Sequence, residues 1–208
     1  MSAPSETSPQ RLPPLSREGI VSAASDLISQ NGHEQLSLRK LAHQLGVTAP
    51  ALYAHVTDKQ DLLSSVAELQ FAALMTRFEA VGVLVEDSNP LERLRALGNA
   101  YVAHATANPN LFRVMFLFPP VLGANSEPGI TTSSSSSEVF GVAAASVEAA
   151  IEAGLLREID PLVAALALWS AAHGIASVLQ MGFGFDEDFQ QALADSAIEI
   201  SISGLQRR

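Results

Sequence analysis

The chain has 208 residues, of which 48% are hydrophobic, and this is enough apolar material for one or two small domains. It contains no cysteine, which excludes disulfides, thiolate metal sites and thiol catalysis and fits a reducing cytoplasm, where we expect the protein to act. A net charge of -10 is unusual for a nucleic-acid-binding protein. Residues 1–66, however, hold five Lys/Arg against six Asp/Glu, so most of the negative charge lies in residues 67–208.

The N-terminal third predicts an arm followed by short helices. Residues 1–15 contain four prolines and no apolar run, so we expect a flexible arm and no secretory signal. A helix is predicted over 16–30. Ser37 can cap a second helix, which Gly46 ends, and Thr48 can cap a third. Two short helices joined by a tight turn are typical of a helix-turn-helix motif, whose second helix enters the DNA major groove.

Two blocks of sequence resemble the DNA-binding domain of the TetR family of bacterial transcription regulators. They are Leu-x-x-Arg-Lys-Leu-Ala-x-x-Leu-Gly-Val in residues 36–47 and Pro-x-Leu-Tyr-x-His-Val in 50–56, followed by Lys59 and Leu62-Leu63. The resemblance implies an all-α fold with a three-helix DNA-binding domain, here 16–61, and a helical ligand-binding and dimerisation domain, here 62–208. It also implies a transcription regulator without enzymatic activity and without a cofactor.

The resemblance implies DNA contacts for a defined set of residues. Base edges would meet the first turn of the reading helix, and phosphates would meet a second group. Because alanine cannot form a bidentate pair with a base, we expect Arg39 to make the strongest base contact. Arg39 could instead be a solvated surface charge, Tyr53 could pack within the hairpin, and Arg11 and Arg17 could reach DNA or remain uninvolved. The predicted DNA-binding residues are Ser37, Arg39, Thr48, Ala49, Pro50, Ala51, Tyr53, His55 and Lys59.

The remainder of the chain predicts further helices. Apolar spacing and capping residues place them at 58–81, 89–108, 111–118, 137–154, 160–182 and 186–205, which brings the total to about nine. Residues 119–136 lack periodicity and are rich in Gly, Pro, Ser and Thr. This segment is either a crossover loop or a gate over a ligand pocket.

Aromatic and histidine side chains in the second domain could line a largely apolar pocket. Helical spacing of this kind also occurs in ordinary cores, and His173 could be a satisfied core or interface histidine. Trp169, His173 and Gly174 resemble the Trp-His-Gly signature of one TetR subgroup. No pair of histidines has the spacing of metal ligands on one helix, so we expect no metal. The predicted ligand-binding residues are Tyr101, His104, Phe112, Met115, Phe116, Trp169 and His173.

Residues 161–185 contain no charged side chain, which raises the question of a membrane span. No lysine or arginine cluster flanks the segment, and polar residues interrupt it, so we expect a helix buried by its own domain on one side and by a second copy on the other. With the last helix it would form a four-helix homodimer interface. The predicted interface residues are Ala164, Leu168, Ala172, Phe189, Leu193 and Ile200.

These patterns predict a homodimeric, sequence-specific regulator, a repressor that a small molecule releases from a pseudo-palindromic double-stranded operator. Two alternatives stay open. One is a helical small-molecule enzyme or carrier with a vestigial DNA-binding hairpin, and the other is a low-specificity DNA-binding protein.

Overall fold

The structure, a computed structural model, describes residues 15–85, 89–118 and 134–207. These ranges form an all-helical molecule, as predicted, with one short 3-10 turn at His33–Gln35. All but the last residue of the expected arm, and most of the segment 119–136, lie outside the described residues. The helices are α1 Arg17–Asn31, α2 Leu38–Gln44, α3 Ala49–Tyr53, α4 Lys59–Leu84, α5 Pro90–Ala107, α6 Pro109–Met115, α7 Ser134–Glu152, α8 Pro161–Leu179 and α9 Glu187–Ser203.

Side-chain caps define most of the helix beginnings. A side-chain oxygen of the residue before the helix accepts a backbone N–H of the first turn at seven helices, and proline follows the cap at α5, α6 and α8. Ser37 is an exception to our prediction, because its side chain makes no capping bond. Its backbone carbonyl instead accepts the Leu41 N–H at 2.9 Å. Helix α7 begins at Ser134, so the last three residues of the expected loop are helical.

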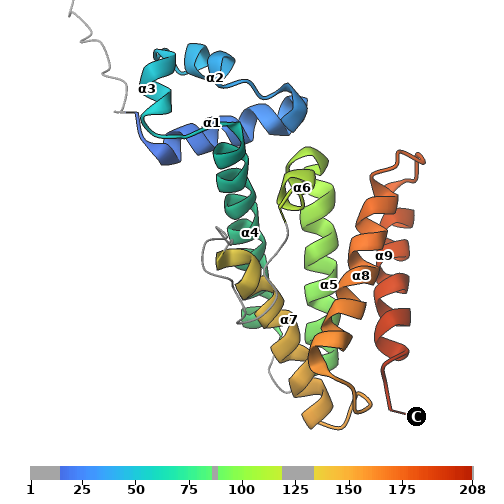
Figure 1. The fold of residues 1–208 in the computed structure, drawn as a ribbon. Coiled ribbons are helices and arrows are strands. Elements are labelled where there is room, and N and C mark those ends of the chain that lie inside the picture. The colour runs from blue at the N-terminus through green and yellow to red at the C-terminus, as the bar shows by residue number, and fades with distance from the viewer. Residues whose placement is uncertain (1–14, 86–88, 119–133, 208) are drawn as a thin grey trace, which may run out of the picture.

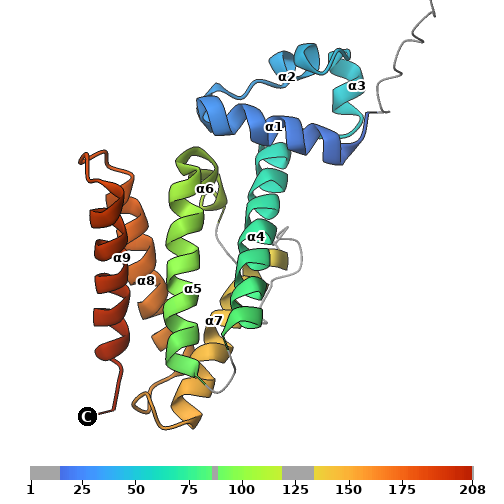
Figure 2. The same cartoon turned by 180° about the vertical axis from the view of Figure 1, so that it is seen from behind.

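Two hydrophobic cores stack along α4. Helices α1, α2 and α3 lie across one end of α4, while α5, α8 and α9 run side by side and α7 packs obliquely against them (Figure 1, and from behind in Figure 2). The first core includes α4 up to Ala67, and the second takes α4 from Phe71 onward. The 26 residues of α4 span about 39 Å. Our expected domain boundary at residue 61 stays a prediction, but one continuous helix serves both cores.

Helix α6 also contributes to both cores. Val114 is fully buried with the residues of the first core, whereas Met115 is fully buried with those of the second. At its start, Asn110 donates from Nδ2 to the backbone oxygen of Ser29 on α1 at 3.1 Å, and Asn108 donates to the Ser29 hydroxyl. Helices α4 and α6 therefore form two separate mechanical connections between the N-terminal helices and the rest.

Helix α8 is long and apolar enough to cross a membrane by length and composition, and it is the one such helix in the described ranges. It packs on α5, α7 and α9 of its own chain, yet only 22% of its most apolar window is buried there. Much of its apolar surface is therefore not covered by its own chain among the described residues.

Candidate functional site

The helix pair α2 and α3 is held by a few deeply buried side chains. Leu41 and Leu52 are fully buried, and Val56 is 2% exposed, so both helices are anchored to α1 and α4. Gly46 has φ of 67°, the left-handed conformation that ends α2 and turns the chain toward α3. Thr48 accepts the Ala51 N–H at 3.3 Å and so caps α3, as predicted. The turn geometry of a helix-turn-helix is therefore present.

The predicted DNA-contact residues are all at least partly accessible to solvent. Four of them are exposed and five are partly exposed. The side chain of Tyr53 is 50% exposed, so it is not buried by packing within the hairpin. Lys59 donates from Nζ to the backbone oxygen of Glu34 at 3.2 Å, which leaves two of its three ammonium hydrogens for another partner. The exposed members are Arg39, Thr48, Pro50 and Tyr53, and the partly exposed members are Ser37, Ala49, Ala51, His55 and Lys59.

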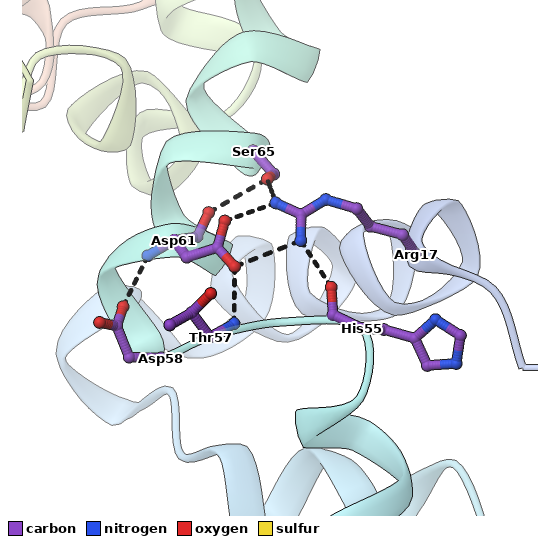
Figure 3. A network of polar contacts seen from close by, with 6 residues as sticks. All are labelled: Arg17, His55, Thr57, Asp58, Asp61 and Ser65. Carbon is purple, nitrogen blue, oxygen red and sulfur yellow. Dashed lines mark hydrogen bonds and ion pairs between the residues drawn. The ribbon is translucent and has the colours of Figure 1, made fainter. Parts of the chain in front are cut away.

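Arg17 fixes the turn between α3 and α4 rather than standing free for DNA. Its guanidinium donates to both carboxylate oxygens of Asp61 and, at 2.7 Å, to the hydroxyl of Ser65 (Figure 3). It also donates at 2.6 Å to the backbone oxygen of His55, whose ring points away from the network. Asp61 in addition accepts the Thr57 N–H at 2.7 Å. We refer to these contacts as the Arg17 network.

The Arg17 network ties the start of α1 to the start of α4 across 44 residues of sequence. Hydrogen bonds from Arg17 are the main reason that the pKa of Asp61 lies below its ordinary value, and the bond to Asp61 raises the pKa of Arg17. Both groups are therefore charged at neutral pH. Of the two arginines that the sequence offered as additional DNA contacts, Arg17 is bonded within this network, and Arg11 lies outside the described residues.

Farther along the same helix, Glu68 fastens α4 to the beginning of α7. Its Oε1 accepts the Ser135 backbone N–H at 3.0 Å and the Ser135 hydroxyl at 2.6 Å. A carboxylate at a helix N-terminus is favoured by the unpaired N–H groups and the helix dipole there. Because Asp61, Ser65 and Glu68 follow one another at intervals of four and three residues, they lie along one stripe of α4.

The second core contains an apolar cavity with about 620 Å³ of space, counting the solvent at its mouth. Side chains of α4, α5, α7, α8 and α9 form its wall, and an apolar lining with a few polar groups is typical of a small-molecule site. Gly98 lets Ile198 of α9 pack closely against α5 at this cavity, because a Cβ atom at position 98 would lie 3.0 Å from a side-chain carbon of Ile198. The lining residues are Phe78, Leu94, Leu97, Gly98, Tyr101, Val139, Phe140, Ala143, Val147, Ala165, Leu168, Trp169, Ala172, Ile198, Ser201 and Ile202.

A hydrogen-bonded cluster of rings stands at one side of this cavity. The Tyr101 hydroxyl lies 2.8 Å from Nδ1 of His173 and accepts the indole N–H of Trp169 at 3.1 Å. Phe112 and Phe116 of α6 pack against His173, with ring centroids 5.4 and 4.8 Å away. The rings thus connect the cavity wall to α6.

Five of the seven predicted ligand residues do not line the cavity. Tyr101 and Trp169 do, whereas Phe112, Phe116 and His173 stand behind them in the ring cluster. Met115 and His104 are buried elsewhere. Burial, with a smaller contribution from the charge of Arg77, lowers the pKa of His104 to about 4, so this ring is neutral at physiological pH. Helical spacing could not separate residues of the wall from residues of the core behind it.

Comparisons with known proteins agree with this geometry. Residues 20–66 match the model of the bacterial regulatory proteins of the tetR family, and residues 94–200 match that of the tetracyclin repressor-like C-terminal domain. The chain belongs to the TetR family. It is 29% identical, over 93% of its length and 83% of the relative's, to an uncharacterized HTH-type transcriptional regulator of Mycobacterium tuberculosis.

Two solved structures place this TetR-family chain among folded relatives. A protein of unknown function from Rhodococcus sp. RHA1 is 25% identical, with a TM-score of 0.78 over 97% of this chain and all of the other. A TetR variant from Acinetobacter baumannii, solved with minocycline, is 22% identical, with a TM-score of 0.65 over 91% of this chain and 96% of the other. The chain is thus a DNA-binding transcription regulator, and the regulators of this family are not enzymes.

In this TetR-family protomer, three residues predicted for the dimer interface face inward. Ala164 is fully buried, Ala172 is 4% exposed, and Leu168 lines the cavity, so the protomer's own interior occupies them. Phe189 and Ile200, by contrast, are 50% and 72% exposed on α9. The prediction assigned the wrong side of α8, because alanines occur on both sides of this helix. Its exposed side carries Val163, Ala167, Ser170 and Gly174.

The cavity also contains residues that sequence reasoning missed. Phe78, Leu94 and Ile198 come from three helices and show the same apolar spacing as any core position. Gly98 offered a signal, since glycine inside a helix lowers its stability and therefore often marks a close approach of another element. Within the described ranges, no group of three acidic, histidine or cysteine side chains is arranged to hold a metal ion.

Proposed function

We propose that this regulator is a ligand-responsive, sequence-specific repressor that leaves its operator when a small molecule enters the apolar cavity. The observation that carries this proposal is that the helices of the cavity wall are tied to the DNA-binding helices by two routes. One runs from α7 through Glu68 to α4 and the Arg17 network. The other runs from the ring cluster through α6 to Ser29 of α1.

The action of a ligand in this proposal is geometric. A two-fold dimer can place both reading helices in successive major grooves only if they lie roughly 34 to 36 Å apart, or at a multiple of that spacing. A ligand that binds better to a different arrangement must weaken operator binding, and operator binding must weaken ligand binding by the same factor. Phe140 of α7 and Trp169 of α8 contact each other, with ring centroids 5.4 Å apart. An occupant of the cavity would displace this contact first.

The dimer in this proposal uses the exposed sides of α8 and α9. Small residues on α8, namely Ala167, Ser170 and Gly174, allow another helix to approach closely, while Phe189 and Ile200 of α9 supply apolar area. Burial against a second copy also accounts for the apolar α8 without a membrane. We assign Leu193, which is partly exposed on α9, to the same interface.

Two finer assignments belong to the same proposal. The C-terminal domain fits the Trp-His-Gly subgroup, because Trp169 and His173 share the ring cluster and Gly174 follows them on α8. The protein would act in the cytoplasm, where a soluble transcription regulator meets its operator.

The test begins with selection of bound duplexes from a random pool, followed by a salt titration of the enriched sequence and of unrelated DNA. The proposal expects an inverted repeat with a specificity ratio on the order of a thousandfold or more. Arg39→Ala should weaken binding by about 1–3 kcal/mol and relax the preference at one position of each half-site. Arg113→Ala, an exposed arginine of α6, is the control for loss of one positive charge.

Weak and salt-sensitive binding to every duplex would contradict sequence-specific repression. It would favour instead the low-specificity alternative, for which the small side chains of the first turn of α3 provide a physical reason. Unchanged operator affinity with a ligand saturating the cavity would contradict the release step alone.

A further inference from the structure

The cavity is poor in hydrogen-bond donors. Among the described residues that line it there is no charged side chain, and thirteen of the sixteen lining residues have purely apolar side chains or are glycine. The three polar side chains are those of Tyr101, Trp169 and Ser201. Among the described lining residues, these three side chains are therefore the ones that can pair with a polar group of an occupant.

Two of these groups, Ser201 and Trp169, donate their hydrogens inside the protein, and the Tyr101 hydroxyl lies 2.8 Å from a ring nitrogen of His173. Ser201 donates to the backbone oxygen of Ala197 at 2.7 Å. The indole of Trp169 can only donate, and it donates to the Tyr101 oxygen. Burial lowers the pKa of His173, so its ring is neutral and has one acceptor nitrogen; we assign this role to Nδ1, which then accepts the Tyr101 hydroxyl hydrogen.

What the wall still offers is the lone pairs of two hydroxyl oxygens, on Ser201 and Tyr101. A hydroxyl oxygen has two acceptor sites, and each of these oxygens has at least one left after the bonds described above. Among the described lining residues, a carboxylate or phosphate would find no free hydrogen-bond donor and no cation, and an ammonium group would find no anion. Even a neutral carbonyl oxygen would lack a donor.

From this inventory we propose that the cavity takes an uncharged, mainly hydrocarbon small molecule whose polar group, where it has one, is a hydrogen-bond donor such as an alcohol. The proposal rests on the ligand response proposed above and specifies the chemical class of the effector. The donor would reach the oxygen of Ser201 or Tyr101, and the hydrocarbon would contact Phe78, Phe140 and Trp169.

Trp169 makes occupancy directly measurable, because it is the only tryptophan of the chain and its ring lies in the cavity wall. The probes are four molecules of similar size, namely 1-octanol, methyl heptanoate, octanoate and octylammonium, titrated at pH 7 against the full-length protein. We expect 1-octanol to change the emission with the highest affinity. Methyl heptanoate, which has no donor, should bind about five- to tenfold more weakly, and both ions at least about a hundredfold more weakly.

A matched pair of variants on α7 identifies the site of the signal. Ala143→Leu fills the cavity from its wall, whereas Ala145→Leu adds the same atoms on the exposed side of the same helix. The octanol response should be lost in the first variant and retained in the second. Retention in both variants would overturn the assignment of the cavity as the binding site.

The results also separate this inference from the proposed repression. Octanoate or octylammonium binding within tenfold of 1-octanol would overturn the uncharged class, and methyl heptanoate binding equal to 1-octanol would overturn the requirement for a donor. If 1-octanol binds as expected and the selected operator is held as tightly as before, the ligand class stands and the release step fails. If an ion binds in the cavity and releases the operator, the release step stands and the uncharged ligand class fails.

Discussion

Asp61→Asn tests whether the Arg17 network positions the DNA-binding helices or only stabilises the fold. The substitution keeps the shape of the side chain but removes the charge and one acceptor oxygen. Asp61 and Arg17 are 28% and 42% exposed, so their screened ion pair contributes about 1 kcal/mol. Loss of the acceptor for the Thr57 N–H adds about 1 kcal/mol. A total of about 2 kcal/mol lowers Tm by about 4–8 °C in a chain of this size.

The operator affinity distinguishes the two roles, because simple electrostatics predicts the opposite sign. Removing one negative charge from the DNA-binding domain should strengthen binding to phosphates. If the Arg17 network instead holds the turn at His55 in its binding geometry, Asp61→Asn should weaken operator binding about fivefold, which corresponds to about 1 kcal/mol. Asp26→Asn, at an exposed position of α1, changes the charge equally and is the control.

The assay is fluorescence anisotropy with the selected operator at two salt concentrations, together with thermal unfolding of both variants. Affinity of Asp61→Asn equal to or above that of Asp26→Asn, accompanied by the expected fall in Tm, would refute a positioning role and leave the network as a stabilising contact.

Three further changes test other parts of the structure. His104 has a pKa of about 4 in the folded protein and an ordinary value of 6.5, so the unfolded chain binds the proton first as the pH falls. The free energy of unfolding therefore decreases between pH 6.5 and pH 4, by at most about 3 kcal/mol. His104→Gln should remove this loss, which urea melts at pH 7 and pH 4.5 would measure. Gly98→Val should cost about 1–3 kcal/mol by overpacking against Ile198 and should abolish the octanol response of Trp169, while Gly141→Val on α7, where an added Cβ meets nothing within 4 Å, should do neither. Glu68→Gln weakens the bond to the N-terminus of α7 and should reduce release of the operator by 1-octanol more than it changes affinity without a ligand; equal release from the variant and the original protein would show that α7 does not act through Glu68.

Features that depend on neighbouring residues could be predicted from the sequence. Asp58, Asn89, Asp160 and Asp186 each cap the helix that their position predicted, since a cap bonds to a backbone N–H only a few residues away. The helix expected over 111–118 instead begins at Pro109, because Asn108, expected at the end of the preceding helix, caps it. The turn at Gly46 followed from the same local chemistry. These signals were sufficient for the helix order and for the helix-turn-helix.

Features that depend on contacts between distant segments could not be predicted from the sequence. Arg17 and Asp61 are two ordinary surface-type residues in the sequence, and only the packing of α1 against α4 brings them together. The two sides of α8 both carry alanine, so nothing local distinguished buried Ala164 from exposed Ala167. The cavity lies between side chains of five helices, and the spacing of apolar residues within one helix does not show how much volume remains between several helices.

The two routes between cavity and DNA-binding helices differ in the forces that carry them, and this difference bears on which one acts in the response. The route through α6 is packed, with Phe112 and Phe116 against the ring cluster and Val114 in the first core, and close-packed contacts transmit displacement with little loss. The route through Glu68 depends on polar bonds at the first turn of α7, which break over a few tenths of an ångström. An occupant that moves Phe140, five residues from Ser135, acts on the polar route, whereas one that moves Trp169 acts through Phe116 on α6. A response abolished by Glu68→Gln and unaffected by Asn110→Ala would assign the signal to α4, and the reverse pattern would assign it to α6.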